Sequence, residues 1–381
     1  MITFAATLGF SGAEEVAVYV YLYNASSTIS AQLDILQQMA AADLSGAGEF
    51  YTKALKRLVS EYKNIRDITE KNAADEQAML LSALLGEEKY TPAAPDIWLV
   101  LETFSSPPVK AEALITLGKI RATHYLPEVI RVLQNVNDAP TADRLTGESI
   151  AFGAIVSLEY FRDPSGYLPV FFATTGWYSN WIKDQALRSL PFIATDPTPF
   201  ILEVIKGTGY NYPAKLTALQ TIEKSDANIR NKASVAVAAL SEGWKGQAYD
   251  PQKRNTLAEM RKTAITMINR YKSNDEAVYP LLERSYNQGN DFDEKTRAVA
   301  ALASRKTDES ARVLSNFLTD LNAKQQSGNI GQEDMQMVRE IIPALGQTGR
   351  PIGRSALNAV IEMDWSSSIK QLAGNALKQI F

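Results

Sequence analysis

The chain contains no cysteine and only one histidine, His124, among its 381 residues. The lack of cysteine excludes disulfides, thiolate zinc sites and a cysteine nucleophile. The single histidine excludes a histidine-rich metal site, and no loop has the spacing of an EF-hand, which leaves an all-carboxylate site as the one open alternative. We therefore expect no metal and no cofactor. The absence of cysteine is compatible with an extracytoplasmic location as well as a cytoplasmic one.

Positive charge is scarce, above all near the start of the chain. There are 39 lysine and arginine residues against 43 aspartate and glutamate residues, a net charge of −4, and the first basic residue is Lys53. Because nucleic-acid binding depends on Lys and Arg contacts with phosphates, this balance argues against a nucleic-acid partner. Residues 1–13 also lack the basic region of a secretory signal and are interpreted as ordinary sequence.

Unbroken apolar runs of membrane-spanning length are also absent. Residues 164–182 and 16–33 carry no charge, but a membrane span needs about 20 predominantly apolar residues. Glycine, proline, serine, threonine and asparagine interrupt both runs. The sequence therefore predicts a soluble protein without a membrane span.

Strand signals are confined to residues 16–23, where β-branched and aromatic residues alternate with others. Residues 11–14, Ser-Gly-Ala-Glu, form a capping box directly before this stretch, so we expect a helix there as well. The fold class predicted from the sequence is all-α.

A helix–turn–helix pattern is present in "VKAEALITLGKIRATHYLPEVIRVL", residues 109–133. Each arm carries its apolar residues on one helical face: Ala113, Leu114, Leu117 and Ile120 on the first, and Leu126, Val129, Ile130 and Leu133 on the second. The same pattern returns at intervals of 32 to 46 residues. Its mark is an anchor pair, a small or apolar residue four positions before a central apolar residue: Ala113/Leu117, Ala154/Leu158, Ala186/Leu190, Ala218/Ile222, Ala264/Ile268, Ala298/Leu302, Ile341/Leu345 and Ala373/Leu377. Because one helix pair cannot bury its own apolar face, such repeats are expected to stack into an α-solenoid.

Capping residues mark the predicted boundaries of these repeats. Asp-Pro pairs at 163–164, 196–197 and 250–251 are expected to begin helices, the last running roughly to Tyr271. Glycines that follow the second helices are expected to adopt the left-handed conformation at helix ends: Gly176, Gly207, Gly243 and Gly289. Before the turn-rich link at 86–96 we expect four helices, at 12–24, 28–43, 49–64 and 72–85. These observations divide the chain into divergent N-terminal capping repeats, 1–95, and a regular solenoid, 96–381.

The segment "VKAEALITLGKI", with its Ala-Leu-x-x-Leu-Gly core, resembles the short HEAT repeats of the bilin-lyase-like group. The resemblance covers 109–133 and 183–206, extends more weakly to 295–318 and 339–362, and is poor before residue 95. It implies a right-handed α-solenoid of HEAT-like helical hairpins. It also implies two enzymatic precedents, the bilin lyases and a family of DNA alkyl-base glycosylases, of which the second requires a cationic groove.

No catalytic residue is predicted. His124 has no recognisable partner, and the adjacent carboxylates Glu14-Glu15 and Glu87-Glu88 do not face each other on a helix. The glycine-rich stretch 207–215, "GTGYNYPAK", lacks the Gly-Lys-Ser/Thr of a P-loop, and 346–354, "GQTGRPIGR", is interpreted as a turn.

Aromatic residues gather in the loops between repeats and form the candidate binding site: Trp177, Tyr178, Trp181, Tyr210, Tyr212 and Trp244, with Tyr249 near the last of them. If these loops lie along one side of the solenoid, the rings form a ladder of the residue types found at binding hot spots. The alternative is that each ring packs its loop over the seam between repeats. In the helix before the first loop, Leu168, Phe171 and Phe172 are expected in the core, with Tyr167 or Val170 towards an edge.

The function predicted from this reasoning is a non-catalytic scaffold that binds a protein or peptide. The alternative is an enzyme or small-ligand binder with a pocket on the curved face, as in the bilin lyases. A deep apolar pocket with convergent polar groups is expected for the alternative, and a broad aromatic surface for the scaffold. Nothing in the sequence indicates an oligomeric state.

Overall fold

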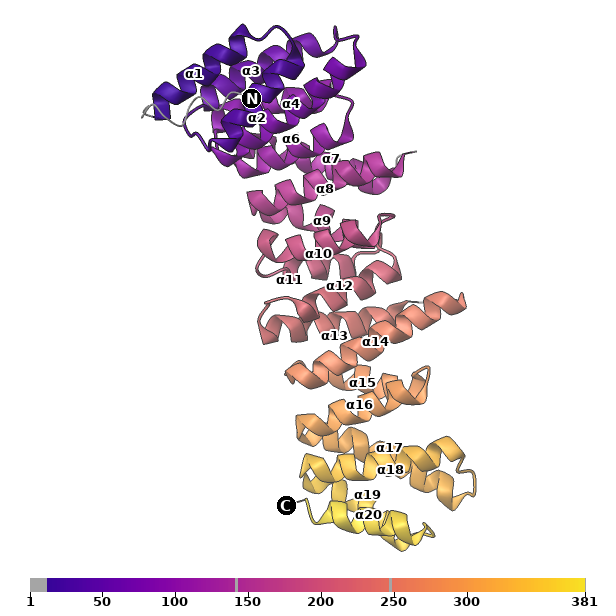
Figure 1. Ribbon diagram of the computed structural model, residues 1–381. Helices are drawn as coiled ribbons and strands as arrows, with labels where there is room; N and C mark the ends of the chain where they lie inside the picture. Colours follow the sequence, from indigo (N-terminus) through magenta and orange to yellow (C-terminus); the bar gives the residue numbers. More distant parts are fainter. Residues whose placement is uncertain (1–11, 141–142, 247–248, 381) are drawn as a thin grey trace. The chain divides into compact units, whose positions relative to one another are not determined.

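The computed structural model describes residues 12–140, 143–246 and 249–380, and every regular element in these ranges is a helix (Figure 1). The all-α prediction is confirmed for this part of the chain. The chain divides into two compact units, residues 1–194 and 195–381. No helix of the described residues combines the length and the apolar character needed to cross a membrane.

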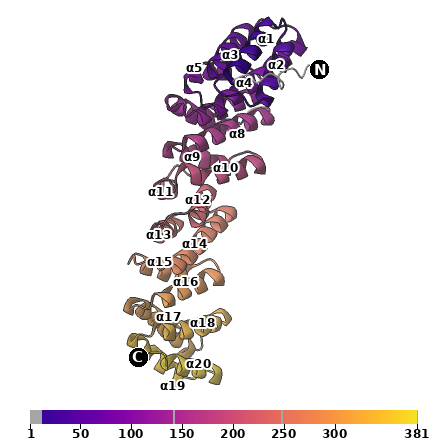
Figure 2. The same cartoon turned by 60° about the vertical axis from the view of Figure 1, so that its left-hand side comes forward.

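Unit 1 contains ten α-helices: α1 (Gly12–Ala25), α2 (Ile29–Ala41), α3 (Gly48–Tyr62), α4 (Ile68–Glu87), α5 (Ala94–Thr103), α6 (Pro107–Lys119), α7 (Leu126–Asp138), α8 (Arg144–Phe161), α9 (Tyr167–Thr175) and α10 (Asn180–Ile193). Three short 3-10 helices, η1 (Thr91–Ala93), η2 (Thr123–Tyr125) and η3 (Pro164–Gly166), precede α5, α7 and α9. Each even-numbered helix packs on the odd-numbered helix before it, and α2, α4, α6, α8 and α10 also pack on one another in succession (Figure 2).

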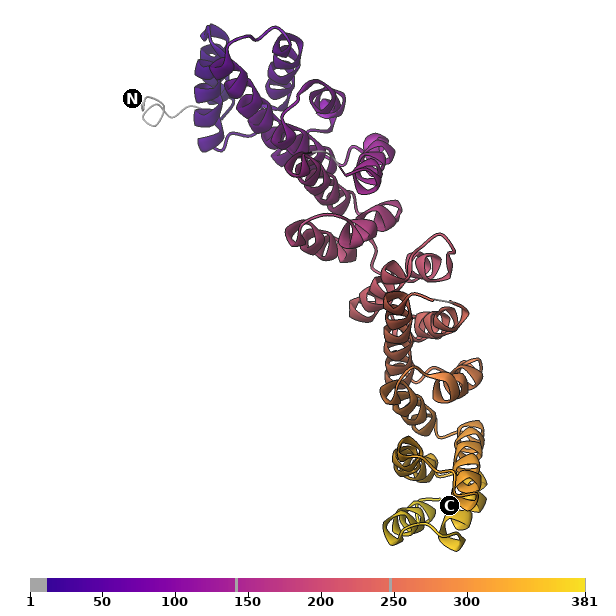
Figure 3. The same cartoon turned by 90° about the vertical axis from the view of Figure 1, so that its right-hand side faces the viewer.

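Unit 2 repeats this arrangement with α11 (Thr198–Lys206), α12 (Tyr212–Lys224), α13 (Ile229–Lys245), α14 (Pro251–Tyr271), α15 (Val278–Gln288), α16 (Phe292–Arg305), α17 (Asp308–Gln326), α18 (Gln332–Thr348), α19 (Arg354–Glu362) and α20 (Ser367–Leu377). A 3-10 helix, η4 (Pro351–Gly353), precedes α19. The even-numbered helices α12 to α20 pack in succession, and so do the odd-numbered helices α11 to α19 (Figure 3).

The anchor pairs lie on the even-numbered helices α6 to α20, and all of their residues except the half-buried Leu377 are buried. The predicted pairing differs from the observed one. Residues 109–133 are expected to form one hairpin, but α6 packs on α5 and α7 packs on α8. An apolar stripe shows that a helix has a partner, but it does not show which of the two flanking helices is that partner.

The predicted glycine caps are wrong. Gly176, Gly207 and Gly289 have negative φ angles, and Gly243 lies inside α13. Seven of the nine described residues with positive φ instead stand four positions after the central buried residue of an even-numbered helix, and the other two, Gly46 and Gly328, do not. The seven have φ between 48° and 67°: Asp43, Lys89, Arg121, Arg162, Lys272, Lys306 and Gly349. Arg and Lys replace the expected glycine because a cation is favourable beside the last carbonyls of a helix.

The same four-residue spacing between a central buried residue and a left-handed residue occurs in α2 and α4, whose central residues Met39 and Leu85 are both fully buried. The four helices expected before residue 95 are present, and the alternating stretch 16–23 lies within α1 as expected. Helix α4 begins at Ile68, earlier than expected, because the Asp67 carboxylate accepts hydrogen bonds from the backbone N–H groups of Thr69 and Glu70. The division at 95/96 stays a prediction.

Helix α9 buries Phe171 as expected, but the rest of its buried face differs from the prediction. Tyr167, Val170 and Phe171 are buried, whereas Leu168 and Phe172 are half-buried. The 3-10 turn η3 directly precedes α9, and helical periodicity alone does not fix the rotation of a helix that follows such a turn.

Alkaline pH is expected to destabilise unit 1. Burial raises the pKa of Tyr23 and Tyr51 from 10.0 to about 12, and the nearby Glu88 and Glu87 carboxylates add to the effect at Tyr51. Between pH 10.0 and about 12, both phenols are therefore protonated in the folded chain but ionised in the unfolded chain. Their contribution to the free energy of unfolding is complete below pH 10.0 and is lost as the pH rises through about 12.

Urea unfolding across this pH range measures the effect, with Tyr51→Phe as the comparison. The difference in unfolding free energy between wild type and this variant should change with pH. A difference that stays constant would contradict burial of the Tyr51 phenol.

Candidate binding surface

The loop between α9 and α10 turns two of its aromatic side chains inward, onto α7. The Trp177 indole Nε1 donates a hydrogen bond to the carbonyl oxygen of Val136 over 2.9 Å. The Tyr178 hydroxyl, 2% exposed as a residue, donates to Asn137 Oδ1 over 2.8 Å, and burial raises the pKa of this phenol. These two rings hold the loop over the seam between repeats.

Glu148 on α8 fixes the start of α10 in the same region. Its carboxylate accepts hydrogen bonds from the backbone N–H and the hydroxyl of Ser179 over 2.6 and 3.0 Å. It also accepts one from Arg144 Nε over 2.9 Å. Burial acts to raise the pKa of Glu148, but these hydrogen bonds outweigh it and hold the pKa below its ordinary value. These hydrogen bonds therefore fix the start of α10 to α8.

Trp181 in the first turn of α10 has the opposite environment. It is 56% exposed, and its ring stacks on that of Phe152 on α8, with the centroids 4.7 Å apart and the planes 22° from parallel. Further along these helices, Tyr160 and Phe192 are exposed at equivalent positions, each two residues after the central Leu of its anchor pair. We call the surface formed by Phe152, Val156, Tyr160, Trp181 and Phe192 the α8–α10 face.

Polar side chains border this face. Glu159 Oε2 on α8 accepts hydrogen bonds from Ser189 Oγ over 2.6 Å and from Gln185 Nε2 over 3.4 Å. Arg188, exposed on α10, stands at the position equivalent to Val156 and donates to Gln185 Oε1 over 2.8 Å. By helical spacing, Arg188 thus stands on the same side of α10 as Trp181 and Phe192.

The two candidate tyrosines of unit 2 are half-exposed. Tyr210 lies against the end of α11, where a Cβ on Gly207 would stand 2.7 Å from the tyrosine ring and 2.8 Å from the Glu203 carbonyl oxygen, so glycine fits best at this position. Its hydroxyl donates to Glu203 Oε1 over 3.3 Å. Tyr212 is the first residue of α12, and Tyr249, five residues after Trp244 in the sequence, is exposed.

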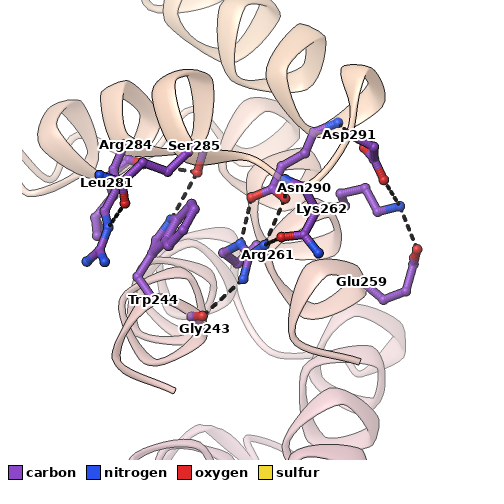
Figure 4. Close-up of polar contacts among 12 residues, drawn as sticks. Gly243, Trp244, Glu259, Arg261, Lys262, Leu281, Arg284, Ser285, Asn290 and Asp291 are labelled. Atoms are coloured by element: carbon purple, nitrogen blue, oxygen red, sulfur yellow. Dashed lines mark hydrogen bonds and ion pairs between the residues drawn. The ribbon is translucent and has the colours of Figure 1, made fainter. Parts of the chain in front are cut away.

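Trp244 is not in a loop but in the last turn of α13. Its ring lies between two guanidinium groups, with the carbon of Arg261 at 4.1 Å and that of Arg284 at 4.7 Å from the ring centroid. Its Nε1 donates to the buried Ser285 Oγ on α15 over 3.1 Å (Figure 4). Trp244 therefore joins α13, α14 and α15.

The Arg261 side chain is the centre of a buried network that sequence reasoning did not find (Figure 4). Its Nε and Nη2 donate to the two carboxylate oxygens of Glu294 over 2.6 and 2.9 Å, and both side chains are at most 5% exposed. Nη1 donates to the Gly243 carbonyl and Nη2 also donates to Asn290 Oδ1, each over 3.2 Å. Every donor atom of this guanidinium has a partner, which makes the network structural and not a binding site. Residues 33 positions apart on two helices give no sequence signal for such a pair.

The six candidate residues thus fall into three groups. Trp177, Tyr178 and Trp244 hold seams between helices, Tyr210 and Tyr212 are half-exposed, and Trp181 is exposed. Their role in binding stays a prediction. Phe152, Tyr160 and Phe192 were missed, although the position two residues after the anchor Leu is visible in the sequence for Tyr160 and Phe192.

The remaining chemistry is sparse. His124 is exposed on η2, with its ring edge-on to Tyr125. Within 12–140, 143–246 and 249–380, no three His, Asp or Glu side chains gather as a metal site requires. No protein-family model matches the chain, and no curated protein matches its sequence.

Trp177→Ala is expected to lower the free energy of unfolding by about 2 kcal/mol, because it removes packing and leaves the Val136 carbonyl without its donor. Trp181→Ala is expected to change it by less than about 1 kcal/mol, because that ring is mostly in solvent. Urea denaturation of the two variants measures the difference. Equal losses would contradict the different environments of the two indoles.

Proposed function

We propose that the chain is a non-catalytic scaffold, a right-handed α-solenoid of HEAT-like helical hairpins, that binds a protein or peptide through the α8–α10 face. Two features support a repeat architecture. The even-numbered helices pack in succession within each unit, and the same left-handed turn recurs four residues after the central apolar residue. Repeats that contact only their neighbours leave long helical surfaces available to a partner.

The observation that carries the proposal is the exposed Trp181 stacked on Phe152. Tryptophan and tyrosine are enriched at binding hot spots, because they contribute a large contact area for little lost conformational freedom. The stacking already restricts the Trp181 ring, so less freedom is lost when a partner covers it.

Arg188 indicates which chemical groups a partner of the α8–α10 face should carry. An exposed guanidinium on the same side of α10 as Trp181 and Phe192 favours a segment that offers apolar side chains together with a carboxylate. The neighbouring Asp184 is also exposed, so the face does not present one sign of charge only. A short amphipathic peptide segment with an acidic residue fits this surface.

Selection of peptides from a random library against the immobilised protein tests the proposal. Peptides that bind the wild-type chain should bind the Trp181→Ala/Phe192→Ala variant at least tenfold more weakly, with its melting temperature nearly unchanged. Ile229→Ala is the matched control, since Ile229 is exposed on α13 in unit 2. Selected peptides that bind all three proteins equally would overturn the proposal. Purification with a tightly held small chromophore and no peptide binding would favour the pocket alternative.

A further inference from the structure

The turn between α18 and α19 is framed by two arginine residues. This stretch, residues 346–354, contains η4, and each guanidinium bonds to the backbone of a neighbouring helix end. Arg350 Nε donates to the carbonyl oxygen of Lys306, directly after α16, and Arg354 Nη2 donates to that of Ile380, after α20, each over 2.8 Å. Both arginine residues are exposed, and no other hydrogen bond joins their guanidinium groups to the described residues. Their remaining N–H groups are therefore available to a ligand.

Two lysine residues stand beside this turn. Lys306 directly follows α16 and Lys378 directly follows α20. Both are exposed, and neither ammonium group has an ion pair or a hydrogen bond within the part of the chain that the structure describes. Between the two arginines, η4 presents Ile352, which is 40% exposed. We call the surface formed by Lys306, Arg350, Ile352, Arg354 and Lys378 the α16–α20 edge.

Acidic side chains do not fully neutralise the α16–α20 edge. Among the described residues, Asp308 is the carboxylate that approaches one of its cations, and Asp308 Oδ1 lies 3.7 Å from Arg350 Nε, beyond hydrogen-bond distance. The neighbouring Glu309 pairs with Arg312 instead. The four cations of the edge are therefore opposed by one exposed carboxylate.

Cations at the opposite end of the same helices have carboxylate partners. Lys295 near the start of α16 pairs with Glu333 on α18 over 2.5 Å, and Lys324 near the end of α17 pairs with Asp334 on α18 over 2.7 Å. Ion pairs therefore balance charge at one end of these helices, and the α16–α20 edge at the other end is left positive.

We propose that the α16–α20 edge binds an acidic segment of a partner protein, in which carboxylates flank an apolar side chain. A guanidinium presents paired N–H donors that match the two oxygens of a carboxylate. The hydrogen bonds to the backbone already orient both guanidinium groups, so less conformational freedom is lost on binding. Ile352 supplies the apolar contact between them. This inference is independent of the α8–α10 face.

The make-up of the edge favours an acidic protein segment over a nucleic acid. None of its five residues has an aromatic ring on which a base could stack. Unit 2 as a whole has 24 basic against 21 acidic side chains, which does not provide the extended positive surface that a phosphate backbone requires. Positive charge at a short edge with an apolar centre fits a short acidic segment.

Peptide selection against the Trp181→Ala/Phe192→Ala variant, which removes the α8–α10 face, tests the proposal. The selected peptides should be rich in aspartate and glutamate, and should bind wild type equally well. Lys306→Asn/Lys378→Glu should weaken their binding about tenfold at low salt, because it removes two attractions and adds one repulsion. Its melting temperature should stay nearly unchanged, because neither lysine side chain has a partner in the chain and asparagine tolerates the left-handed conformation of residue 306.

Lys253→Asn/Arg254→Glu is the matched control. It makes the same change in charge at two exposed residues of α14 in the same unit, and its binding should equal that of wild type. Equal binding by the edge variant and wild type would overturn the proposal, and so would an equal loss in the control, which would show only a general effect of charge. A labelled single-stranded DNA that binds wild type as tightly as the peptides, and is lost in the edge variant, would contradict an acidic protein partner.

Discussion

Replacing Glu294 with alanine is expected to lower the free energy of unfolding of unit 2 by about 3–5 kcal/mol. The variant leaves the Arg261 guanidinium buried while two of its nitrogen atoms lose the carboxylate oxygens that accept their hydrogen bonds. The remaining partners, Gly243 and Asn290, satisfy only part of the donor capacity. Urea unfolding followed by circular dichroism measures the loss.

Two further variants show whether the loss comes from the uncompensated charge. Arg261→Met/Glu294→Leu removes both charges and should recover part of the loss, because well-packed apolar residues often replace a buried ion pair at little cost. Glu333→Ala breaks the more exposed pair with Lys295 and should change stability by no more than about 1 kcal/mol. If Glu294→Ala is no worse than Glu333→Ala, the buried network does not exist as described.

Ala218→Asp is expected to destabilise unit 2 by about 3 kcal/mol or more. Ala218 is fully buried on α12, and this helix packs on α11, α13 and α14. An aspartate at this position is an unpaired buried charge in a space that holds one methyl group. Thermal unfolding measures the loss, and Gln220→Asp, at an exposed position of the same helix, is the matched control.

Amide hydrogen exchange on the Ala218→Asp variant shows how far the damage extends. If repeats contact only their neighbours, protection should fall in α11 to α14 and be kept in α17 to α20. Melting within a degree or two of wild type would show that the anchor register is wrong. A uniform loss of protection throughout unit 2 would contradict a repeat architecture.

The positions of the anchor residues could be predicted because the buried positions of a helix recur with the helical period, and this period is visible in the spacing of apolar residues. The anchor residues Ala218 and Ile222 are buried as their spacing indicates. Helix starts were also predictable where a cap is local. Asp250 accepts a hydrogen bond from the Lys253 backbone N–H, and α14 runs from Pro251 to Tyr271 as expected.

The candidate site was harder to predict because exposure depends on the three-dimensional arrangement of helices. Trp177 and Trp181 stand four residues apart in the same uncharged stretch, yet one donates to the Val136 carbonyl and the other faces solvent. The Arg261–Glu294 pair joins two helices, and the sequence around either residue does not indicate that they lie close together. The left-handed turns were misplaced for a related reason, because Arg162 and Lys272 do not have the residue type that usually marks such turns.

The most direct test of the proposed scaffold is amide hydrogen exchange with and without a saturating peptide selected from the random library. The proposal predicts added protection confined to α8 and α10, centred on residues 152–160 and 181–192, and loss of this footprint in the Trp181→Ala/Phe192→Ala variant. A footprint restricted to the aromatic loops of unit 2, or one that persists in the variant, would contradict it.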